Sequence, residues 1–167
     1  MSTTLILLIQ CAILAYAFVG GVFLAFSDFI MRALTRTSGH GGVEAMQMIN
    51  REVFRWVFMT LFLGLAVVSL VIAAYGAIAL TGPARTLIML AGLLYLVGCF
   101  GVTVFFNVPM NNVLDGMELT DAKTSDFWFE TYVPRWTFWN SIRTTACALS
   151  AASLLLGLVW MTPGQAA

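Results

Sequence analysis

Four long stretches of this chain carry no charged residue, and they constrain the fold more than any other feature of the sequence. They cover residues 1–27, 56–84, 86–114 and 144–167. A helix needs about 20 apolar residues to cross the hydrocarbon core of a bilayer, and each stretch is long enough. Lipid offers no partner to an unpaired backbone group, so such segments must be helical. We therefore predict an all-α integral membrane protein, an up-down four-helix bundle with helices over residues 4–30, 43–80, 86–110 and 127–161.

The composition agrees with a membrane location. Hydrophobic residues make up 60% of the chain and charged residues only 10%, whereas a soluble domain carries about 25% charged residues. The length of 167 residues suits one domain, 1–167. The formal net charge is zero, so nothing in the charge balance points to nucleic acid as a partner.

The basic residues lie almost entirely on one side of the predicted membrane helices. Loops that join the first helix to the second and the third to the fourth, with the adjoining helix ends, hold all of the Lys and Arg except Arg85. The positive-inside rule then predicts that both large loops are cytoplasmic and both termini lie outside. The helical segments that extend beyond the membrane, residues 43–53 and 127–143, are accordingly expected to be cytoplasmic.

Two local patterns predict how individual helices pack. Ala17, Gly21 and Ala25 form a stripe of small residues on the first helix, a spacing that lets a second helix approach closely. Asp28 follows Gly21 by seven residues and is therefore expected on nearly the same face, pointing into the bundle. On the third helix, Pro109 removes a backbone hydrogen bond, which predicts a kink or a helix end at that position.

Polar side chains gather at the end of the bundle where the large loops lie. On the fourth helix they share one arc of about 100°, the width of a buried stripe, and on the third they are four residues apart. Two interpretations stay open: hydrogen bonds and an ion pair that only fix helix packing, or the wall of a ligand site. The set comprises Asp28, Asn50, Asn107, Asn111, Trp136, Trp139, Asn140 and Arg143.

Several chemistries have too few residues to support them. His40 is the one histidine and lies in a glycine-rich loop, so a histidine-ligated haem or a multi-histidine metal site is not expected. Cys11, Cys99 and Cys147 lie on three different predicted helices and lack metal-ligand spacing, so they predict no disulfide framework. We expect no metal and no cofactor, and any catalysis would use an organic pocket.

Four motifs occur in order along nearly the whole chain. Asn-x-Pro-x-Asn spans residues 107–111, and Trp-x-x-Trp-Asn-x-x-Arg spans residues 136–143. They are preceded by Gly-Gly-Val-Phe-Leu-Ala-Phe-Ser-Asp at residues 20–28 and by Ala-Met-Gln-Met-Ile-Asn-Arg at residues 45–51. Together these motifs resemble the anthrone oxygenase-like family of small four-helix membrane proteins, many of them bacterial.

The resemblance implies a location in a bacterial inner membrane and, by analogy, an activity. Fungal members of the family oxidise anthrones to anthraquinones with O2, without an established metal or flavin. By that analogy, this chain is expected to oxidise an anthrone- or hydroquinone-like aromatic with O2 in a cytoplasm-facing pocket.

As a hypothesis, the oxidation of an anthrone gives each polar residue a role. A base removes a proton, and the resulting anion passes an electron to O2. Asp28, if buried, is the expected base, and Trp136 and Trp139 are expected to stack on the ring. The oxyanion is expected to be held by Arg143 and Asn140 together with Asn107 and Asn111, while Asn50 is a further substrate-binding residue.

The competing hypothesis is a protein without catalytic activity. It would bind a quinone or a lipid, or serve as an accessory subunit of a membrane complex. Under either hypothesis the expected partners are membrane lipid and an aromatic or quinone small molecule, and a homo-oligomer could form through the small-residue face of the first helix.

Overall fold

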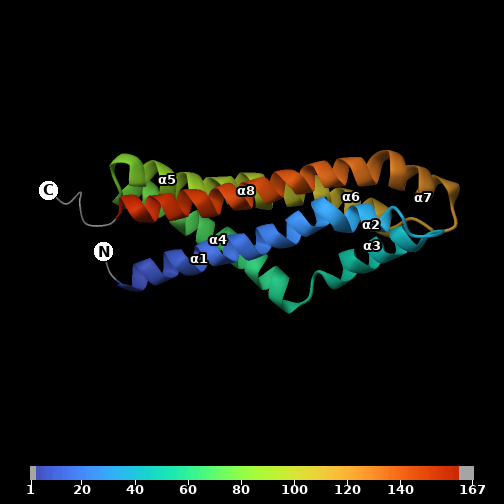
Figure 1. Cartoon of the computed structure of the whole chain (residues 1–167), viewed down its shortest axis with the longest axis horizontal. Helices are drawn as coiled ribbons and strands as arrows, with labels where there is room; N and C mark the ends of the chain where they lie inside the picture. Colours follow the sequence, from blue (N-terminus) through green and yellow to red (C-terminus); the bar gives the residue numbers. More distant parts are fainter. Residues whose placement is uncertain (1–2, 162–167) are drawn as a thin grey trace.

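The computed structural model describes residues 3–161, and within that range the chain is helical and contains no strand. Four helical spans are long and apolar enough to cross a membrane: Thr3–Leu34, Trp56–Ala79, Gly82–Asp115 and Ala122–Trp160. The prediction of an all-α membrane protein is confirmed. We call these the first to fourth spans; both ends of the described chain lie at the same end of the molecule (Figure 1).

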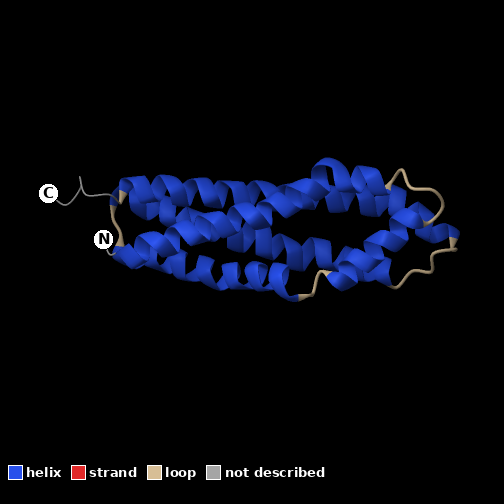
Figure 2. Ribbon diagram, turned by 60° about the horizontal axis from the view of Figure 1, so that its bottom comes forward, coloured by secondary structure: helices blue, strands red, loops and turns tan. Residues whose placement is uncertain are grey.

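Most spans consist of several consecutive helical elements. The first span joins α1 (Thr3–Ala25), η1 (Phe26–Ile30) and α2 (Met31–Leu34), and the second span is α4 (Trp56–Ala79). The third span joins α5 (Gly82–Leu93), η2 (Leu94–Gly101), η3 (Thr103–Asn107) and α6 (Val108–Asp115). The fourth joins α7 (Ala122–Asp126), η4 (Phe127–Tyr132) and α8 (Val133–Trp160), and a separate helix α3 (Gly41–Glu52) precedes α4. Figure 2 shows that helices make up almost the whole described chain.

The spans pack in pairs, with α1 along α8, α4 along α5, and α5 along α8. Close approach depends on glycine at two of these contacts. A Cβ on Gly92 would collide with the backbone oxygen of Ser69, and one on Gly20 would lie 2.9 Å from Cβ of Cys147. Buried tyrosines add polar links, since Tyr95 donates to the carbonyl of Phe62 at 2.8 Å.

The small-residue stripe on the first span does not face the bundle. Ala17 and Gly21 are exposed, and no atom lies within 4 Å of a Cβ built on Gly21. Gly20, one position earlier, makes the close approach to α8 instead. The expectation that Ala17 and Gly21 pack against a neighbouring span is therefore wrong, because spacing identifies a small face without saying which side of the helix is covered.

Wide π-helical turns interrupt three of the spans and alter the helical register. In η1, η3 and η4 the closing N–H bonds a carbonyl five residues back: Met31 to Phe26, Val108 to Thr103, and Val133 to Trp128. Residues after such a turn are rotated relative to a regular α-helix. The third span continues past Pro109 to Asp115, so of the predicted kink or helix end, the helix end is wrong. The wide turn η3 ends at Asn107, two residues before this proline.

The predicted helix over residues 43–80 is two helices. α3 ends at Glu52, Arg55 has extended geometry with φ −75° and ψ 149°, and α4 begins at Trp56. Gln47 on α3 donates to the carbonyl oxygens of Leu114 at 2.8 Å and Met117 at 3.0 Å. These bonds hold α3 against α6 and its end, while α4 diverges from α3 and runs along α5 (Figure 1).

Candidate functional site

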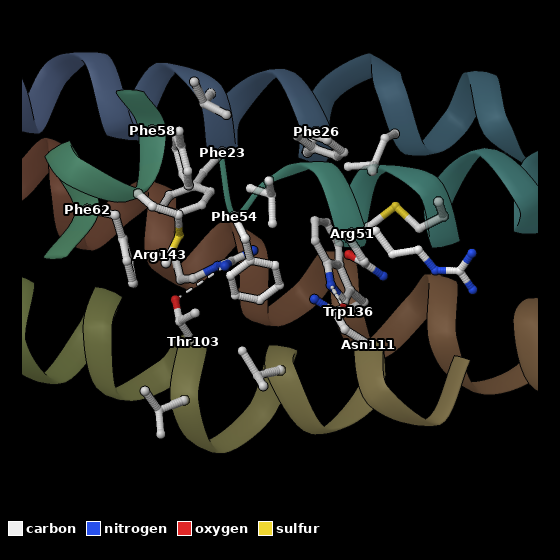
Figure 3. A pocket seen from close by; sticks show the side chains of 18 of the residues that line it. Phe23, Phe26, Arg51, Phe54, Phe58, Phe62, Thr103, Asn111, Trp136 and Arg143 are labelled. Carbon is white, nitrogen blue, oxygen red and sulfur yellow. Dashed lines mark hydrogen bonds between the residues drawn. The ribbon is translucent and has the colours of Figure 1, made fainter. Parts of the chain in front are cut away.

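A pocket of about 580 Å³ lies where α3 and α4 diverge, between the first, third and fourth spans (Figure 3). Its wall is mostly aromatic and aliphatic, with a few polar side chains. Phe23 meets Phe58 edge-to-face with ring centroids 5.8 Å apart, and Phe58 stacks on Phe62 at 6.2 Å. The polar and charged residues of the lining are Asn50, Arg51, Thr103, Asn111, Asn112, Asp115 and Arg143.

Arg143 places a buried cation in this wall. Its side chain donates to Oγ1 of Thr103 at 3.2 Å and to Oδ1 of Asn140 at 2.6 Å. The guanidinium carbon lies 4.1 Å from the ring centroid of Phe23 and 5.2 Å from that of Trp136. Arg143 is 5% exposed, its Nε has no hydrogen-bond partner, and it forms no ion pair with any carboxylate in residues 3–161.

This arrangement leaves a positive charge balanced only by neutral oxygens and ring faces. A buried charge is costly unless it is paired, and cation–π contacts offset only part of that cost. The pocket wall is therefore electrostatically suited to an anionic or partly negative oxygen.

Asn140 positions this guanidinium from behind the wall. Its amide nitrogen donates to the carbonyl oxygen of Phe23 at 2.6 Å and to Oγ of Ser27 at 2.7 Å, which leaves Oδ1 directed at Arg143. Asn107 is also fully buried and donates to the carbonyl oxygen of Trp136 at 3.2 Å. Neither asparagine lines the pocket, so both act on it through Arg143 and Trp136 rather than by contact.

A second polar network lies between Arg143 and the loop end of the pocket. Asn111 accepts two hydrogen bonds at Oδ1, one from the hydroxyl of Tyr132 and one from Nε1 of Trp136, both at 2.8 Å. Asn50 donates to the Tyr132 hydroxyl at 3.4 Å. Asn50, Asn111 and Trp136 line the pocket, and Tyr132 holds them from behind.

Asp28 lies outside the site. Its side chain is exposed and does not line the pocket, and Arg32 bonds only its backbone oxygen. The expectation that Asp28 points into the bundle is wrong for two reasons. The reference residue, Gly21, is itself exposed, and the wide turn η1 at Phe26–Ile30 rotates Asp28 away from the position that a regular helix would give it.

Trp139 also faces away from the pocket. It stacks on Phe106 with ring centroids 3.7 Å apart and an interplanar angle of 13°, and it does not line the pocket. Trp136 instead lines the pocket. It shares a face of α8 with Arg143, seven residues later, and its ring centroid lies 5.2 Å from the guanidinium carbon. Of the two tryptophans expected to stack on a bound ring, only Trp136 therefore lines the pocket, and the expected position of Trp139 is wrong.

Several lining residues carried no distinctive signal in the sequence. In a charge-free stretch, the sequence does not distinguish an aromatic residue that faces a pocket from one that faces lipid. This applies to Phe23, Phe58, Phe62 and Phe100. Thr103 differs from these rings, because the four-residue spacing of Thr103, Asn107 and Asn111 predicts that the three share the polar face of the third helix.

Two buried thiols lie one turn deeper than the Arg143–Thr103 contact. Sγ of Cys147 is 3.5 Å from Sγ of Cys99, and both cysteines are free. In residues 3–161, no group of three His, Cys, Asp or Glu side chains is arranged to hold a metal ion.

Comparison with known proteins identifies the family. A family model described as anthrone oxygenase matches residues 51–153. Among curated proteins there is no match, and among solved structures there is none. The matched region contains Asn107, Asn111, Trp136, Asn140 and Arg143 and leaves out the first span. With that match over most of its length, and with four apolar spans, this chain belongs to the anthrone oxygenase family of membrane proteins.

Proposed function

We propose that this protein oxidises an anthrone- or hydroquinone-like aromatic with O2, and that the substrate binds in the pocket beside Arg143. One observation carries the proposal: a buried guanidinium without a carboxylate partner stands in the wall of an aromatic-lined pocket. A preorganised cation in a water-poor site stabilises an oxyanion more strongly than the same cation in water. The family membership supports the same chemistry by analogy.

The reaction can be written for an anthrone so that atoms and electrons balance. Loss of one proton from the ring CH2 gives an anion whose charge lies largely on oxygen, beside Arg143. The anion transfers one electron to O2, and the resulting carbon radical and superoxide combine into a peroxide anion. The peroxide takes up one proton, then loses water together with the second CH2 hydrogen. One anthrone and one O2 thus give one anthraquinone and one water. A hydroquinone has no ring CH2, so its two electrons and two protons pass to O2 and give one quinone and one H2O2.

The first proton has a route to solvent at the loop end of the pocket. Asp115 is the one carboxylate among the lining residues, and Oδ1 accepts from Nε of Arg51 at 2.7 Å. Its side chain is 42% exposed, so water reaches it. We assign no side-chain base, since Asp28, the base expected from sequence, lies outside the pocket and Asp115 is too far from Arg143 to reach the substrate. The proton is taken by a water molecule that enters the pocket from this end and contacts the substrate.

The test is O2 consumption by the full chain in lipid nanodiscs with an anthrone. Replacing Arg143 by Met should lower the rate by about 10²–10³, the loss typical for one oxyanion donor, whereas Arg143→Lys should retain more. Arg135→Met is the matched control, because Arg135 is exposed on the same helix and does not line the pocket. An unchanged rate in Arg143→Met, in protein that is still folded, would remove the oxyanion role.

A second candidate function is binding without catalysis. It is favoured by the lining itself, which contains no histidine and no carboxylate apart from the ion-paired Asp115. In that case purified protein should carry a bound quinone or lipid, identified by mass spectrometry, and anthrone should cause no O2 uptake. An empty pocket in a stable complex with another protein chain would instead point to an accessory subunit.

We also propose the orientation and the location. The pocket lies at the loop end that carries nearly all Lys and Arg, and the positive-inside rule supports a cytoplasmic position for this end, with both termini outside. The bacterial inner membrane is proposed by analogy with the family that the chain resembles. Reporter fusions at each terminus test the orientation. The exposed Ala17 and Gly21 would suit contact with a second copy, which cross-linking in native membranes can examine.

A further inference from the structure

The pocket is open on one side through apolar side chains. Val22 on α1, Leu63 on α4 and Val104 on η3 all line it, and they are 42%, 48% and 42% exposed. Each stands in a charge-free stretch of its span, where the surrounding solvent is lipid. We call these three residues the lipid-facing rim.

The rim lies next to the buried cation. Val22 precedes Phe23, whose ring is 4.1 Å from the Arg143 guanidinium carbon. Val104 follows Thr103, whose hydroxyl accepts from Arg143 at 3.2 Å. Val22 and Val104 therefore lie at the same depth of the bundle as the Arg143 guanidinium.

The other end of the pocket has the opposite character. Arg51 and Asp115 line it, their side chains are 54% and 42% exposed, and they form an ion pair of 2.7 Å. Asp115 follows Thr103 by twelve residues of helix, which is about 18 Å at 1.5 Å per residue. One end of the pocket is therefore charged and exposed to water. The Arg143 guanidinium and the lipid-facing rim lie at the other end.

We propose that the ligand of this pocket is a membrane-dissolved phenol or hydroquinone with a hydrocarbon chain, and that the chain leaves the pocket through the lipid-facing rim. The proposal rests on the proposed function in taking an aromatic oxygen as the group that Arg143 holds. It goes further in naming a lipid-tailed substrate class and a route of entry from the bilayer. The ring oxygen bonds the guanidinium while the chain stays in lipid.

The lining favours an aromatic head over a phosphate head. Six phenylalanine rings and Trp136 line the pocket, and flat rings bury well against such walls. A phosphate is usually held by several charged donors, whereas Arg143 is the one lining cation free of an ion pair and already donates to Thr103 and Asn140.

The experiment measures binding under nitrogen, so that it does not depend on oxidation. The probes are a decyl-substituted hydroquinone and its chain-free methyl analogue, and binding is the excess over empty phosphatidylcholine nanodiscs. Val22→Trp and Leu63→Trp fill the rim. Leu70→Trp is the matched control, because Leu70 is 62% exposed on the same α4 helix and lines neither large cavity.

We expect the rim variants to weaken decyl-hydroquinone binding roughly tenfold, the size expected when a tight apolar passage is overpacked. Binding of the methyl analogue should not change, and Leu70→Trp should bind both probes as the unmodified chain does. An equal loss of both probes, or no loss of either, would overturn the proposal. Thermal unfolding of each variant shows that it is folded.

Two further measurements distinguish a failure of this inference from a failure of the proposed oxidation. If anionic phosphatidylglycerol in the nanodisc displaces the decyl probe, the pocket holds a lipid phosphate and the proposal is overturned. Rim-dependent binding without any O2 uptake would retain this inference and reject the oxidation. Rapid O2 uptake with a rim that has no effect would retain the oxidation and reject the lipid-tailed substrate.

Discussion

Arg143 donates a 2.6 Å hydrogen bond to Oδ1 of Asn140, one turn earlier on α8. Asn140 is held in turn by its own bonds to the first span, at the carbonyl oxygen of Phe23 and Oγ of Ser27. The direction of the buried cation is thus set by a contact between the first and fourth spans, and a change in that contact should change the pocket.

Asn140→Ala should therefore reduce both stability and function. The change removes the Asn140 amide from the Phe23 carbonyl and from the Arg143 guanidinium, which keeps only its bond to Thr103. Losing the partner of a buried polar group typically costs about 1–3 kcal/mol. We expect a lower unfolding temperature in detergent and a lower rate of anthrone-dependent O2 uptake. An Asn140→Ala protein that unfolds at the original temperature and turns over at the original rate would contradict the positioning role. Thr145→Ala is the control, because Thr145 is exposed on α8 and its hydroxyl donates to the carbonyl oxygen of Ser141 on the same helix.

The two tryptophans of the fourth span should behave differently on substitution. Trp136→Leu removes a ring from the pocket wall and the 2.8 Å bond to Asn111, so ligand affinity should fall by about tenfold. Trp139→Leu removes a ring that stacks on Phe106 outside the pocket, so affinity should stay the same. Titration of both variants with decyl-hydroquinone checks the difference, and a larger loss for Trp139→Leu would show that the pocket is assigned to the wrong face of α8.

Asp28→Asn should leave O2 uptake unchanged. The carboxylate is exposed and outside the pocket, and the bond from Arg32 goes to the backbone oxygen, which the substitution keeps. Steady-state O2 consumption alongside Arg143→Met measures the contrast. A large loss in Asp28→Asn would mean that this residue is the base after all and reaches the substrate in another conformation.

Gly92→Ala should destabilise the bundle, because the added Cβ collides with the backbone oxygen of Ser69 on α4. Backbone cannot move aside as a flexible side chain can, and overpacking of this kind typically costs about 1–3 kcal/mol. Gly64→Ala is the matched control, since no atom lies within 4 Å of a Cβ built there. Thermal unfolding in detergent should separate the two variants, and equal unfolding temperatures would contradict the close α4–α5 contact.

The sequence predicted which polar residues lie near one another at the site, but not which of them face the pocket. The sequence predicted that Asn50, Asn111, Trp136 and Arg143 gather at one end of the bundle, and all four line the pocket. It did not distinguish them from Asp28 and Trp139, which face away. A constant angle per residue predicts the direction of a side chain correctly only until the first wide turn. Four such turns lie close to this site, including η2, which carries the lining residue Phe100.

The sequence by itself determined the four apolar spans, the all-α class and the family, because each depends on local composition or on motifs read in order. Only the tertiary structure decided which side of each span is covered. In a bilayer the outer surface is as apolar as the interior, so the contrast that orients an amphipathic helix in water is missing. The break between α3 and α4, the aromatic lining from Phe23 to Phe100, and the unpaired charge of Arg143 follow from contacts between distant segments, and those contacts make the pocket.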